Sequence, residues 1–534
     1  MNYWENPYRS ARSPVVAARG MVATSHPLAV QAGIEMLRRG GNAVDAALAT
    51  AIALTVVEPT SNGIGGDAFA LVWDGQRLYG LNGSGRAPAA LSLEKIRALG
   101  HTTMPARGWL PVTVPGAPAA WRDLHKKFGK LRFAELFEPA IFYAEHGHPI
   151  APIVAQAWAG AVEAYRELRG AEFRGWWETF ARDGRAPHAG EIWASPDHAR
   201  TLRRIAQSYA EDFYQGELGH AIVRFAQETG GYLRERDLTE HRSSWVEPIS
   251  VNYRGYDVWE IPPNAHGIVA LIGLNILESF DLSRYPRDSA ESFHLQIEAL
   301  KLAFADGHRY VADPDFAPVP VRELLDKDYA ARRRALLGER ALDPLPGDPY
   351  SAGTVYLCTA DSHGMMVSLI QSNYMGFGSG IVVPQTGIAL QNRGACFSLD
   401  AQHPNAFQPQ KRPYHTIIPG FLTKDGKAIG PFGVMGGFMQ PQGHLQMIVN
   451  TVDYGMNPQA SLDAPRWQWV RSKEIEIESD ADPKIIESLR ARGHSVKIAE
   501  SSGRFGRGQI IWRLPSGAYI AGSDKRADGC AMGI

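Results

Sequence analysis

Residues 351–380 read Ser-Ala-Gly-Thr-Val-Tyr-Leu-Cys-Thr-Ala-Asp-Ser-His-Gly-Met-Met-Val-Ser-Leu-Ile-Gln-Ser-Asn-Tyr-Met-Gly-Phe-Gly-Ser-Gly, and this stretch decides the fold. Residues 354–360 are rich in β-branched and aromatic side chains, and residues 365–370 are apolar, so each predicts a strand. The residues between them, Asp361-Ser362-His363-Gly364, are typical of a turn. The stretch therefore predicts a β-hairpin.

The predicted pairing sets the surroundings of one threonine. It places Thr354 at the start of a strand, opposite Gln371 and beside Ser372, above the glycine-rich loop 376–380. Two interpretations follow from this stretch alone. It is either an ordinary hairpin of the core or the site of a catalytic threonine, and the neighbouring segments distinguish the two.

The segment before the hairpin has the composition of a linker. Residues 338–353 contain three prolines, three glycines and few apolar side chains. Exposed chain of this kind tolerates cleavage. Because the segment ends directly at Thr354, the sequence favours a threonine that a cut turns into a new N-terminus.

Bulk composition excludes several classes of function. The 534 residues are 45% hydrophobic and 21% charged, with a net charge of -1, which argues against nucleic acid or anionic membrane as the main partner. Three cysteines make no disulfide framework, and no zinc-binding spacing occurs, so we expect neither a metal nor a cofactor. The N-terminus lacks the apolar core of a signal peptide, and the longest apolar run, 46–57, is too short to span a bilayer. We expect a cytoplasmic protein.

Three other segments carry structural expectations. Residues 43–57 are apolar nearly all round and follow Asn42, which predicts a capped, buried helix. The glycine loop 63–66 matches neither nucleotide-binding spacing, so it favours close backbone packing around a cleft over phosphate binding. Residues 414–422 are expected to form a strand.

Motifs along nearly the whole chain resemble the γ-glutamyltranspeptidase family, in the family's order. They are Gly40 to Ala46, Gly63 to Gly66, Val114 to Gly116, Glu298 to Asp306, Asp313 to Phe316, Gly433 to Gly437, Asp453 to Asn457, Ala464 to Arg466 and Ser523 to Gly529. The resemblance implies an N-terminal nucleophile hydrolase with an α+β fold, a four-layer αββα sandwich. It also implies one precursor that cuts itself into a large subunit, residues 1–353, and a small subunit, residues 354–534, which form one folded unit.

The resemblance assigns the chemistry to a few residues. The hydroxyl of Thr354 would be the nucleophile, and the α-amine freed by cutting the Gly353–Thr354 bond would be its base. Ser372 matches a position that hydrogen-bonds the nucleophile. Gly436 and Gly437 match the glycines whose N–H groups stabilise the tetrahedral intermediate.

Substrate-recognition positions depart from the family pattern. Well-studied members bind the γ-glutamyl α-carboxylate with an arginine that is Ser84 here, although Arg86 lies two residues away. The acids that hold the α-amino group are missing from residues 394–398, and Arg393 stands where a Gln or Glu would assist. The remaining candidate substrate-binding residues, at positions that differ from the family's serines and asparagine or lie beside them, are Asn373, Tyr374, His415 and Thr416.

These departures change the expected substrate. A pocket without an ammonium counter-charge but with Arg86 or Arg393 suits a carboxylate. We expect hydrolysis of the amide of a small acid without a free α-amine, as in oxamate amidohydrolases and glutaryl-type acylases. Two alternatives stay open: a γ-glutamyltransferase or glutathione hydrolase, and an uncleaved, non-enzymatic relative. Arg393 could also sit in a structural salt bridge, and a homo-oligomer of the two-subunit unit is compatible with the sequence.

Overall fold

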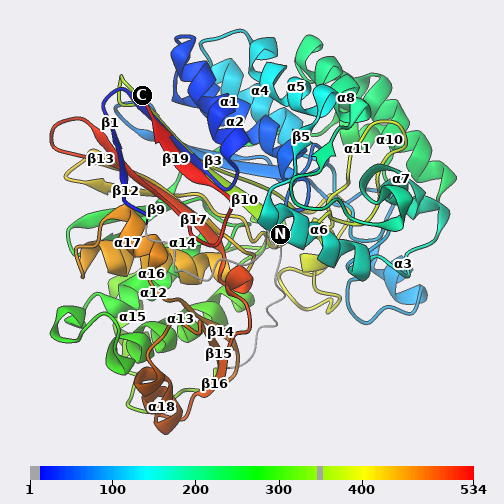
Figure 1. Cartoon of the computed structure of the whole chain (residues 1–534). Helices are drawn as coiled ribbons and strands as arrows, with labels where there is room; N and C mark the ends of the chain where they lie inside the picture. The colour runs from blue at the N-terminus through cyan, green and yellow to red at the C-terminus, as the bar shows by residue number, and fades with distance from the viewer. Residues whose placement is uncertain (1–11, 345–352) are drawn as a thin grey trace.

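The computed structural model of the chain describes residues 12–344 and 353–534. Within these ranges, two seven-stranded antiparallel sheets pack face to face, and helices cover the outer face of each sheet (Figure 1). The predicted class, an α+β four-layer αββα sandwich, is confirmed.

The first sheet, here called the hairpin sheet, contains the predicted hairpin. In spatial order its strands are β19 (Cys530–Gly533), β2 (Gly20–Thr24), β10 (Gly353–Asp361), β11 (Met366–Tyr374), β3 (Asp67–Trp73), β4 (Leu78–Asn82) and β7 (Ser244–Val246). The second sheet, here called the partner sheet, runs β1 (Val15–Ala17), β18 (Tyr519–Ser523), β17 (Arg507–Arg513), β13 (Lys427–Met435), β12 (Gly420–Lys424), β9 (Tyr256–Glu260) and β8 (Ile249–Tyr253). Two small sheets are formed by β14 (Trp467–Arg471), β15 (Glu474–Ile477) and β16 (Ser495–Ile498), and by β5 (His148–Pro149) and β6 (Ile192–Trp193).

Apolar side chains fill the space between the two large sheets. Phe69, Tyr356 and Ile370 of the hairpin sheet meet Phe421 and Ile511 of the partner sheet, all fully or almost fully buried. The sheets approach closely at Gly433, where an added Cβ would lie 2.5 Å from the Tyr356 ring. This contact fixes β10 against β13.

A large group of helices shares one apolar core with the outer face of the hairpin sheet. These helices are α1 (Pro27–Arg38), α2 (Ala43–Val57), α4 (Ala117–Phe128), α5 (Glu138–His146), α6 (Pro152–Ala164), α7 (Arg174–Phe180), α8 (Pro196–Gln207), α9 (Glu211–Gln215), α10 (Glu217–Glu228) and α11 (Glu235–Thr239). All residues of α2 are buried, and Asn42 and Asp45 form a capping box at its start. The predicted capped, buried helix is confirmed.

The outer face of the partner sheet is covered by a second group of helices. They are α12 (Gly267–Leu277), α13 (Ala290–Tyr310), α14 (Val321–Leu324), α15 (Lys327–Arg334), α16 (Met439–Val452), α17 (Pro458–Asp463) and α18 (Pro483–Ala491). The short α3 (Leu93–Ala98) packs instead against residues 397–407. In the parts of the chain that the structure describes, no helix is long and apolar enough to cross a membrane.

The hairpin forms as predicted, but its register differs by one position. Val355, not Thr354, lies opposite Gln371, in a ladder that runs regularly to Ala360 opposite Met366, so the turn itself sets the different register. At the other end of the ladder Gly353 lies opposite Tyr374, so that Ser372 and Asn373 together oppose Thr354 in a β-bulge. Such a bulge places an extra residue on one strand and re-aims its side chain. The extra residue therefore lies on β11, and Thr354 faces this bulge from the start of β10.

The predicted strand over residues 414–422 is only partly correct. Strand β12 begins at Gly420, and the preceding residues touch a neighbour through one isolated bridge, between Ala265 and His415. Apolar residues at 417 and 418 suggested a strand, but they are buried between the sheets without joining either ladder. The segment is thus a buried loop.

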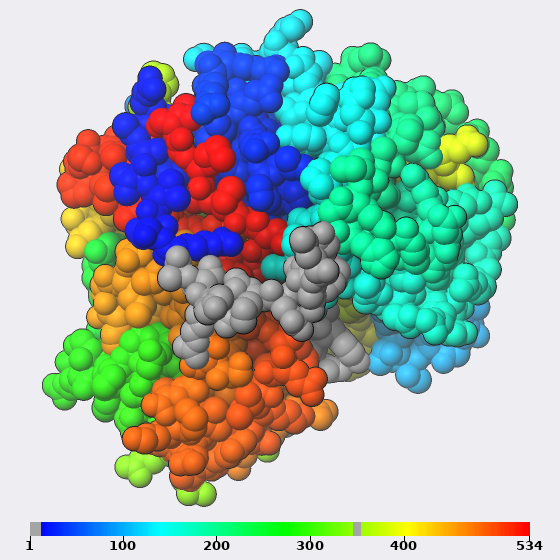
Figure 2. All heavy atoms as spheres, in the orientation of Figure 1, coloured from blue at the N-terminus to red at the C-terminus, as the bar shows by residue number. Residues whose placement is uncertain are grey.

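Segments from both sides of the predicted cut alternate in the hairpin sheet. Strand β10 lies between β2 and β11, and β11 lies between β10 and β3. The last strand, β19, completes the edge beside β2. Figure 2 shows the same interleaving at the surface, where red C-terminal residues lie among blue N-terminal ones. The proposed subunits, 1–353 and 354–534, would therefore share one sheet.

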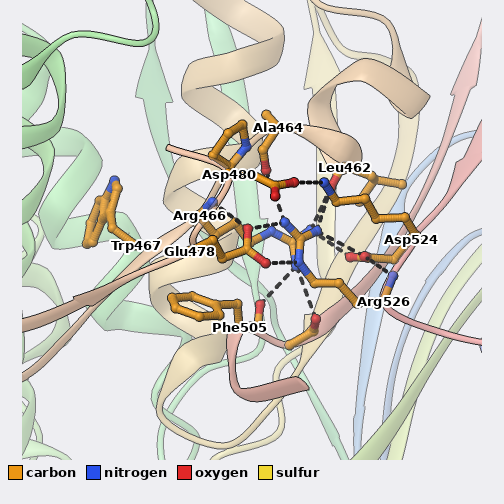
Figure 3. Close-up of polar contacts among 12 residues, drawn as sticks. Leu462, Ala464, Arg466, Trp467, Glu478, Asp480, Phe505, Asp524 and Arg526 are labelled. Carbon is orange, nitrogen blue, oxygen red and sulfur yellow. Dashed lines mark hydrogen bonds and ion pairs between the residues drawn. The ribbon is translucent and has the colours of Figure 1, made fainter. Parts of the chain in front are cut away.

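Near the C-terminus, two buried arginines are held in a dense polar network (Figure 3). Arg526 donates to both carboxylate oxygens of Glu478 and to Oδ1 of Asp524. Arg466 donates to Oδ2 of Asp524 at 2.7 Å. Carbonyl groups of residues 462, 464, 505 and 506 accept the remaining bonds. The network joins β15 to the loops that flank β17 and β18.

Candidate active site

Thr354 and Ser372 meet where the hairpin opens. Their hydroxyl oxygens lie 3.0 Å apart, so that one donates to the other, and both residues are fully buried. The backbone N–H of Tyr374 donates to Ser372 Oγ at 2.7 Å, which fixes the orientation of the serine. The sequence-based expectation that Ser372 lies beside Thr354 agrees with this geometry, despite the shifted register.

The glycine loop before β3 packs closely against the end of the hairpin. An added Cβ at Gly66 would lie 2.7 Å from Asn373 Oδ1, and one at Gly63 would lie 2.9 Å from Asn373 Nδ2. The loop thus needs glycines so that its backbone can approach Asn373. Neither polar atom of the Asn373 side chain has a hydrogen-bond partner among the described residues. Next to it, Tyr374 has a φ of 77°, a conformation that is rare for a residue other than glycine.

Arg393 is fully buried beside the hairpin end. It starts a short 3-10 helix, Arg393–Cys396. Its Nη1 donates to Thr416 Oγ1 at 2.7 Å, and its guanidinium carbon lies 4.4 Å from the centre of the Tyr374 ring. Within residues 12–344 and 353–534, its Nε and Nη2 have no hydrogen-bond partner, and no carboxylate lies within 4.0 Å of it. The alternative of a structural salt bridge is therefore wrong for the described residues.

Asp67 is a site residue that the sequence analysis missed. It begins β3, directly opposite Ser372 on β11. Its Oδ1 accepts from the Gly85 N–H at 3.1 Å and from Gln391 Nε2 at 2.8 Å. Burial raises the pKa of the Asp67 carboxyl to about 7, although Arg393 and these hydrogen bonds oppose the rise. The available signal was an acid at the head of an otherwise apolar strand, directly after the glycine loop.

His415 and Thr416 connect Asp67 with Arg393. His415 Nε2 lies 3.0 Å from Asp67 Oδ2, and His415 Nδ1 accepts from the Ile417 N–H at 3.4 Å, so Nε2 carries the proton and donates to Asp67. Burial, and then Arg393, lower the pKa of His415 well below its usual value. The imidazole therefore stays neutral, while Thr416 accepts from Arg393.

Gly436 and Gly437 lie between the end of β13 and the start of α16. Their φ angles are 134° and 60°, and their N–H groups donate no hydrogen bond to any described residue. The ring of Phe438, the next residue, stacks on Tyr414 at 5.8 Å, and Gln440 Oε1 accepts from the Ile418 N–H at 2.9 Å. The residues that follow the two glycines thus contact the same 414–418 loop that reaches Arg393.

Arg86 does not join this group, and its role as a substrate-binding residue stays a prediction. Its guanidinium lies 2.7 Å from Asp315 and 3.4 Å from Asp313 and donates to the Gln410 carbonyl. These acids neutralise it. Arg86 therefore offers no unpaired cation to a substrate, whereas Arg393 does.

One cluster of potential metal ligands occurs in the described part of the chain: His294, Glu298 and His494. Lys301 Nζ lies 2.7 Å from Glu298 Oε1, so an ammonium already supplies the cation there. Lys301 also donates to the Leu342 carbonyl, and Glu298 accepts from the Leu342 N–H. This cluster therefore anchors the start of the predicted linker; residues 345–352 of that linker lie outside the described residues.

Comparisons with known proteins agree with these features. The sequence model of γ-glutamyltranspeptidase matches residues 29–534. The chain is 36% identical to the glutathione hydrolase-like YwrD proenzyme of Bacillus subtilis, over 97% of this chain and 99% of that protein. It is 33% identical to the oxamate amidohydrolase proenzyme of Klebsiella pneumoniae, over 97% and 99%. Its structure matches the crystal structure of cephalosporin acylase from Bacillus halodurans with a TM-score of 0.97 and 54% identity, over 100% of this chain and 99% of that one.

Proposed function

Since the chain belongs to the γ-glutamyltranspeptidase family, we propose that Thr354 is its nucleophile and that its substrate is the amide of a small carboxylic acid without a free α-amine. The chain is an enzyme, an autoprocessing amide hydrolase of the N-terminal nucleophile type. The assignment of its residues and of its substrate class is the proposal.

Maturation would create the base that the nucleophile needs. The Thr354 hydroxyl attacks the Gly353 carbonyl, and the peptide C–N bond breaks, which frees the Thr354 amine and leaves Gly353 as an ester on Oγ1. Water then hydrolyses this ester, which releases the Gly353 carboxylate and restores the hydroxyl. An α-amine has a reference pKa of about 7.7–8.0, so a useful fraction is neutral near pH 7. Before the cut this nitrogen is an amide and cannot accept the proton.

Turnover would use the same hydroxyl a second time. The Thr354 amine takes the hydroxyl proton while Oγ1 bonds to the substrate carbonyl carbon. The N–H groups of Gly436 and Gly437 stabilise the oxyanion, an interaction worth on the order of 10²–10³ in rate per donor. The C–N bond then breaks, the leaving amine takes the proton, and water hydrolyses the acyl ester to release the acid. Ser372 holds the Thr354 hydroxyl in place.

The unpaired guanidinium of Arg393 is the observation that carries the substrate assignment. An unpaired buried charge is costly, and the fork of Nε and Nη2 matches the two oxygens of a carboxylate. Arg393 stacks on Tyr374, whose N–H binds Ser372 next to Thr354. A short acid that places its carboxylate on Arg393 would thus present its amide to the nucleophile.

The same surroundings disfavour a γ-glutamyl substrate. The carboxyl group of Asp67 interacts electrostatically with Arg393. Its oxygens already accept hydrogen bonds from His415, Gln391 and the Gly85 N–H. It therefore offers no oxygen to a substrate ammonium. Cys396 stands in the segment where the family's acids are missing, and burial raises the pKa of its thiol, so the thiol offers a substrate ammonium no negative charge.

Two assays test the proposal. The unmodified protein should give two bands on a denaturing gel, and Thr354→Ala should give one uncut band and lose at least about 10³-fold in activity. Thr359→Ala is the matched control, because Thr359 lies on the same strand but donates to the Ala43 carbonyl away from the site. It should be cut and active.

A substrate panel separates the candidate activities. Glutaryl and oxamate-type amides should be cleaved faster than γ-glutamyl anilides and faster than neutral amides of equal length. A clear preference for γ-glutamyl anilides contradicts the assignment of substrate and favours a glutathione hydrolase. If the unmodified protein stays uncut and inactive, the assignment of Thr354 as the nucleophile is contradicted as well.

A further inference from the structure

Asp67 lies beside the proposed nucleophile but takes no part in the steps above. It is opposite Ser372 in the hairpin sheet, and Ser372 contacts Thr354. Directly opposed residues of antiparallel strands project to the same face. A fully buried carboxyl group in this position requires a physical explanation.

The bonds of Asp67 tie distant segments together. Its Oδ1 holds the backbone of Gly85 and the side chain of Gln391, and its Oδ2 accepts from His415. These partners come from three segments far apart in the sequence. His415 has one other hydrogen bond through its ring, from the Ile417 N–H, so Asp67 determines where the ring lies.

The orientation of His415 bears directly on Arg393. The residue after His415 is Thr416, whose hydroxyl accepts from Arg393 Nη1 at 2.7 Å. We propose that Asp67 is a positioning residue of the acid-binding site, which orients His415 and, through Thr416, sets the guanidinium of Arg393 toward the substrate carboxylate. This inference rests on the proposed function, since it assumes that Arg393 binds the acid.

The charge of Asp67 gives the inference a measurable signature. The ionisable groups that face it are Arg393, His415, Arg412 and Tyr214. Burial lowers the pKa of His415 and raises the pKa of Tyr214, so both are neutral near pH 7, whereas Asp67 has a pKa of about 7.

The sign of the effect follows from the position of the charge. Below pH 7 Asp67 is protonated and the charge of Arg393 is uncompensated; above pH 7 the Asp67 carboxylate partly compensates it. A ligand carboxylate should therefore bind more weakly as the pH rises through 7. By linkage, binding should raise the pKa of Asp67 and take up protons.

Calorimetry on the processed, unmodified enzyme tests this with glutarate as the probe. At pH 7, titrations in two buffers of different ionisation enthalpy should reveal uptake of a fraction of a proton, with much less uptake at pH 5.5. The Kd should rise by about fivefold between pH 6 and pH 8. Buffer-independent heats at pH 7 together with a constant Kd overturn the inference.

Variants separate positioning from a general structural role. Asp67→Asn removes the charge at similar size, so its Kd for glutarate should change with pH less than that of the unmodified enzyme. His415→Gln retains an N–H donor toward Asp67, and His415→Leu does not. The KM for a glutaryl amide should rise about fivefold in the Leu variant and return toward the unmodified value in the Gln variant, with a smaller change in kcat.

The outcomes distinguish this inference from the proposed function. If glutarate binds neither at pH 6 nor at pH 8, the acid specificity fails, and the role of Asp67 fails with it. If glutarate binds through Arg393 but without proton uptake, the role of Asp67 alone fails. The freed Thr354 amine, with a reference pKa of about 7.7–8.0, would also take up protons when an acid binds, so the uptake is assigned to Asp67 only if Asp67→Asn reduces it. If Asp67→Asn folds poorly, the KM values of His415→Leu and His415→Gln decide the test.

Discussion

Arg526 and Arg393 are both buried, yet their surroundings differ completely. Arg526 donates to two carboxylates, Glu478 and Asp524, and to the carbonyls of Leu462 and Ala464 (Figure 3). The two carboxylates raise the pKa of Arg526, although burial opposes the rise. Arg393 donates to one hydroxyl and stacks on one ring. A buried arginine whose donors are all paired stabilises the fold, whereas we propose that a buried arginine with unpaired donors binds a ligand.

The largest expected effect comes from breaking the saturated site. Arg526→Met leaves the carboxylates of Glu478 and Asp524 buried with one cation fewer, which should cost about 3–5 kcal/mol. The measurement is urea unfolding in the uncut Thr354→Ala background, which keeps the chain in one piece. A loss below about 1 kcal/mol would mean that the network is not needed for stability.

The same substitution at the unsaturated site should affect binding and spare the fold. Arg393→Met removes a charge that no described carboxylate pairs, so the free energy of unfolding should stay within about 1 kcal/mol or rise. In the active enzyme the KM for a glutaryl amide should rise about 100-fold, because charge-assisted bonds to a carboxylate are worth about 1.5–3 kcal/mol. Equal destabilisation by the two Met variants would remove the contrast between the sites.

The smallest effect should come from the hydroxyl that steadies Arg393. Thr416→Val keeps the shape of the side chain but removes the acceptor of the Arg393 Nη1 bond. We expect the KM for a glutaryl amide to rise about fivefold, equivalent to about 1 kcal/mol. Steady-state kinetics on an acid amide and a neutral amide of equal length checks it; an equal rise for both substrates would show that Thr416 does not act through Arg393.

The fold follows from local signals wherever those signals agree. The hairpin turn, the cap at Asn42 and the apolar surface of α2 all predict elements that the structure contains. The register of the hairpin and the bulge on β11 opposite Thr354 were not predictable, because counting from a turn assumes a known turn length and a regular ladder. The prediction of a strand over residues 414–418 was wrong for a related reason. The apolar residues of this loop are buried between the sheets without pairing as a strand.

At the candidate site, residue types were predictable and contacts were not. The arginine at 393 could be singled out, as could the hydroxyl at 372. Whether Arg86 or Arg393 is the unpaired cation depended on Asp313 and Asp315, which lie more than 200 residues beyond Arg86 in the sequence and reach it only in the folded chain. The role of Asp67 was not predictable for the same reason, because its hydrogen-bond partners also come from other segments of the chain.

The interleaving of strands in the hairpin sheet has a consequence for inheritance. In the proposed two-chain form, β10 and β11 of the small subunit are wedged between β2 and β3 of the large one. Neither subunit could dissociate without breaking the strand pairing of this sheet, so in this form both subunits of a molecule would derive from the same precursor chain. A cell that carries one allele damaged in the first half and another damaged in the second could not recover a working enzyme by exchanging halves between mature molecules.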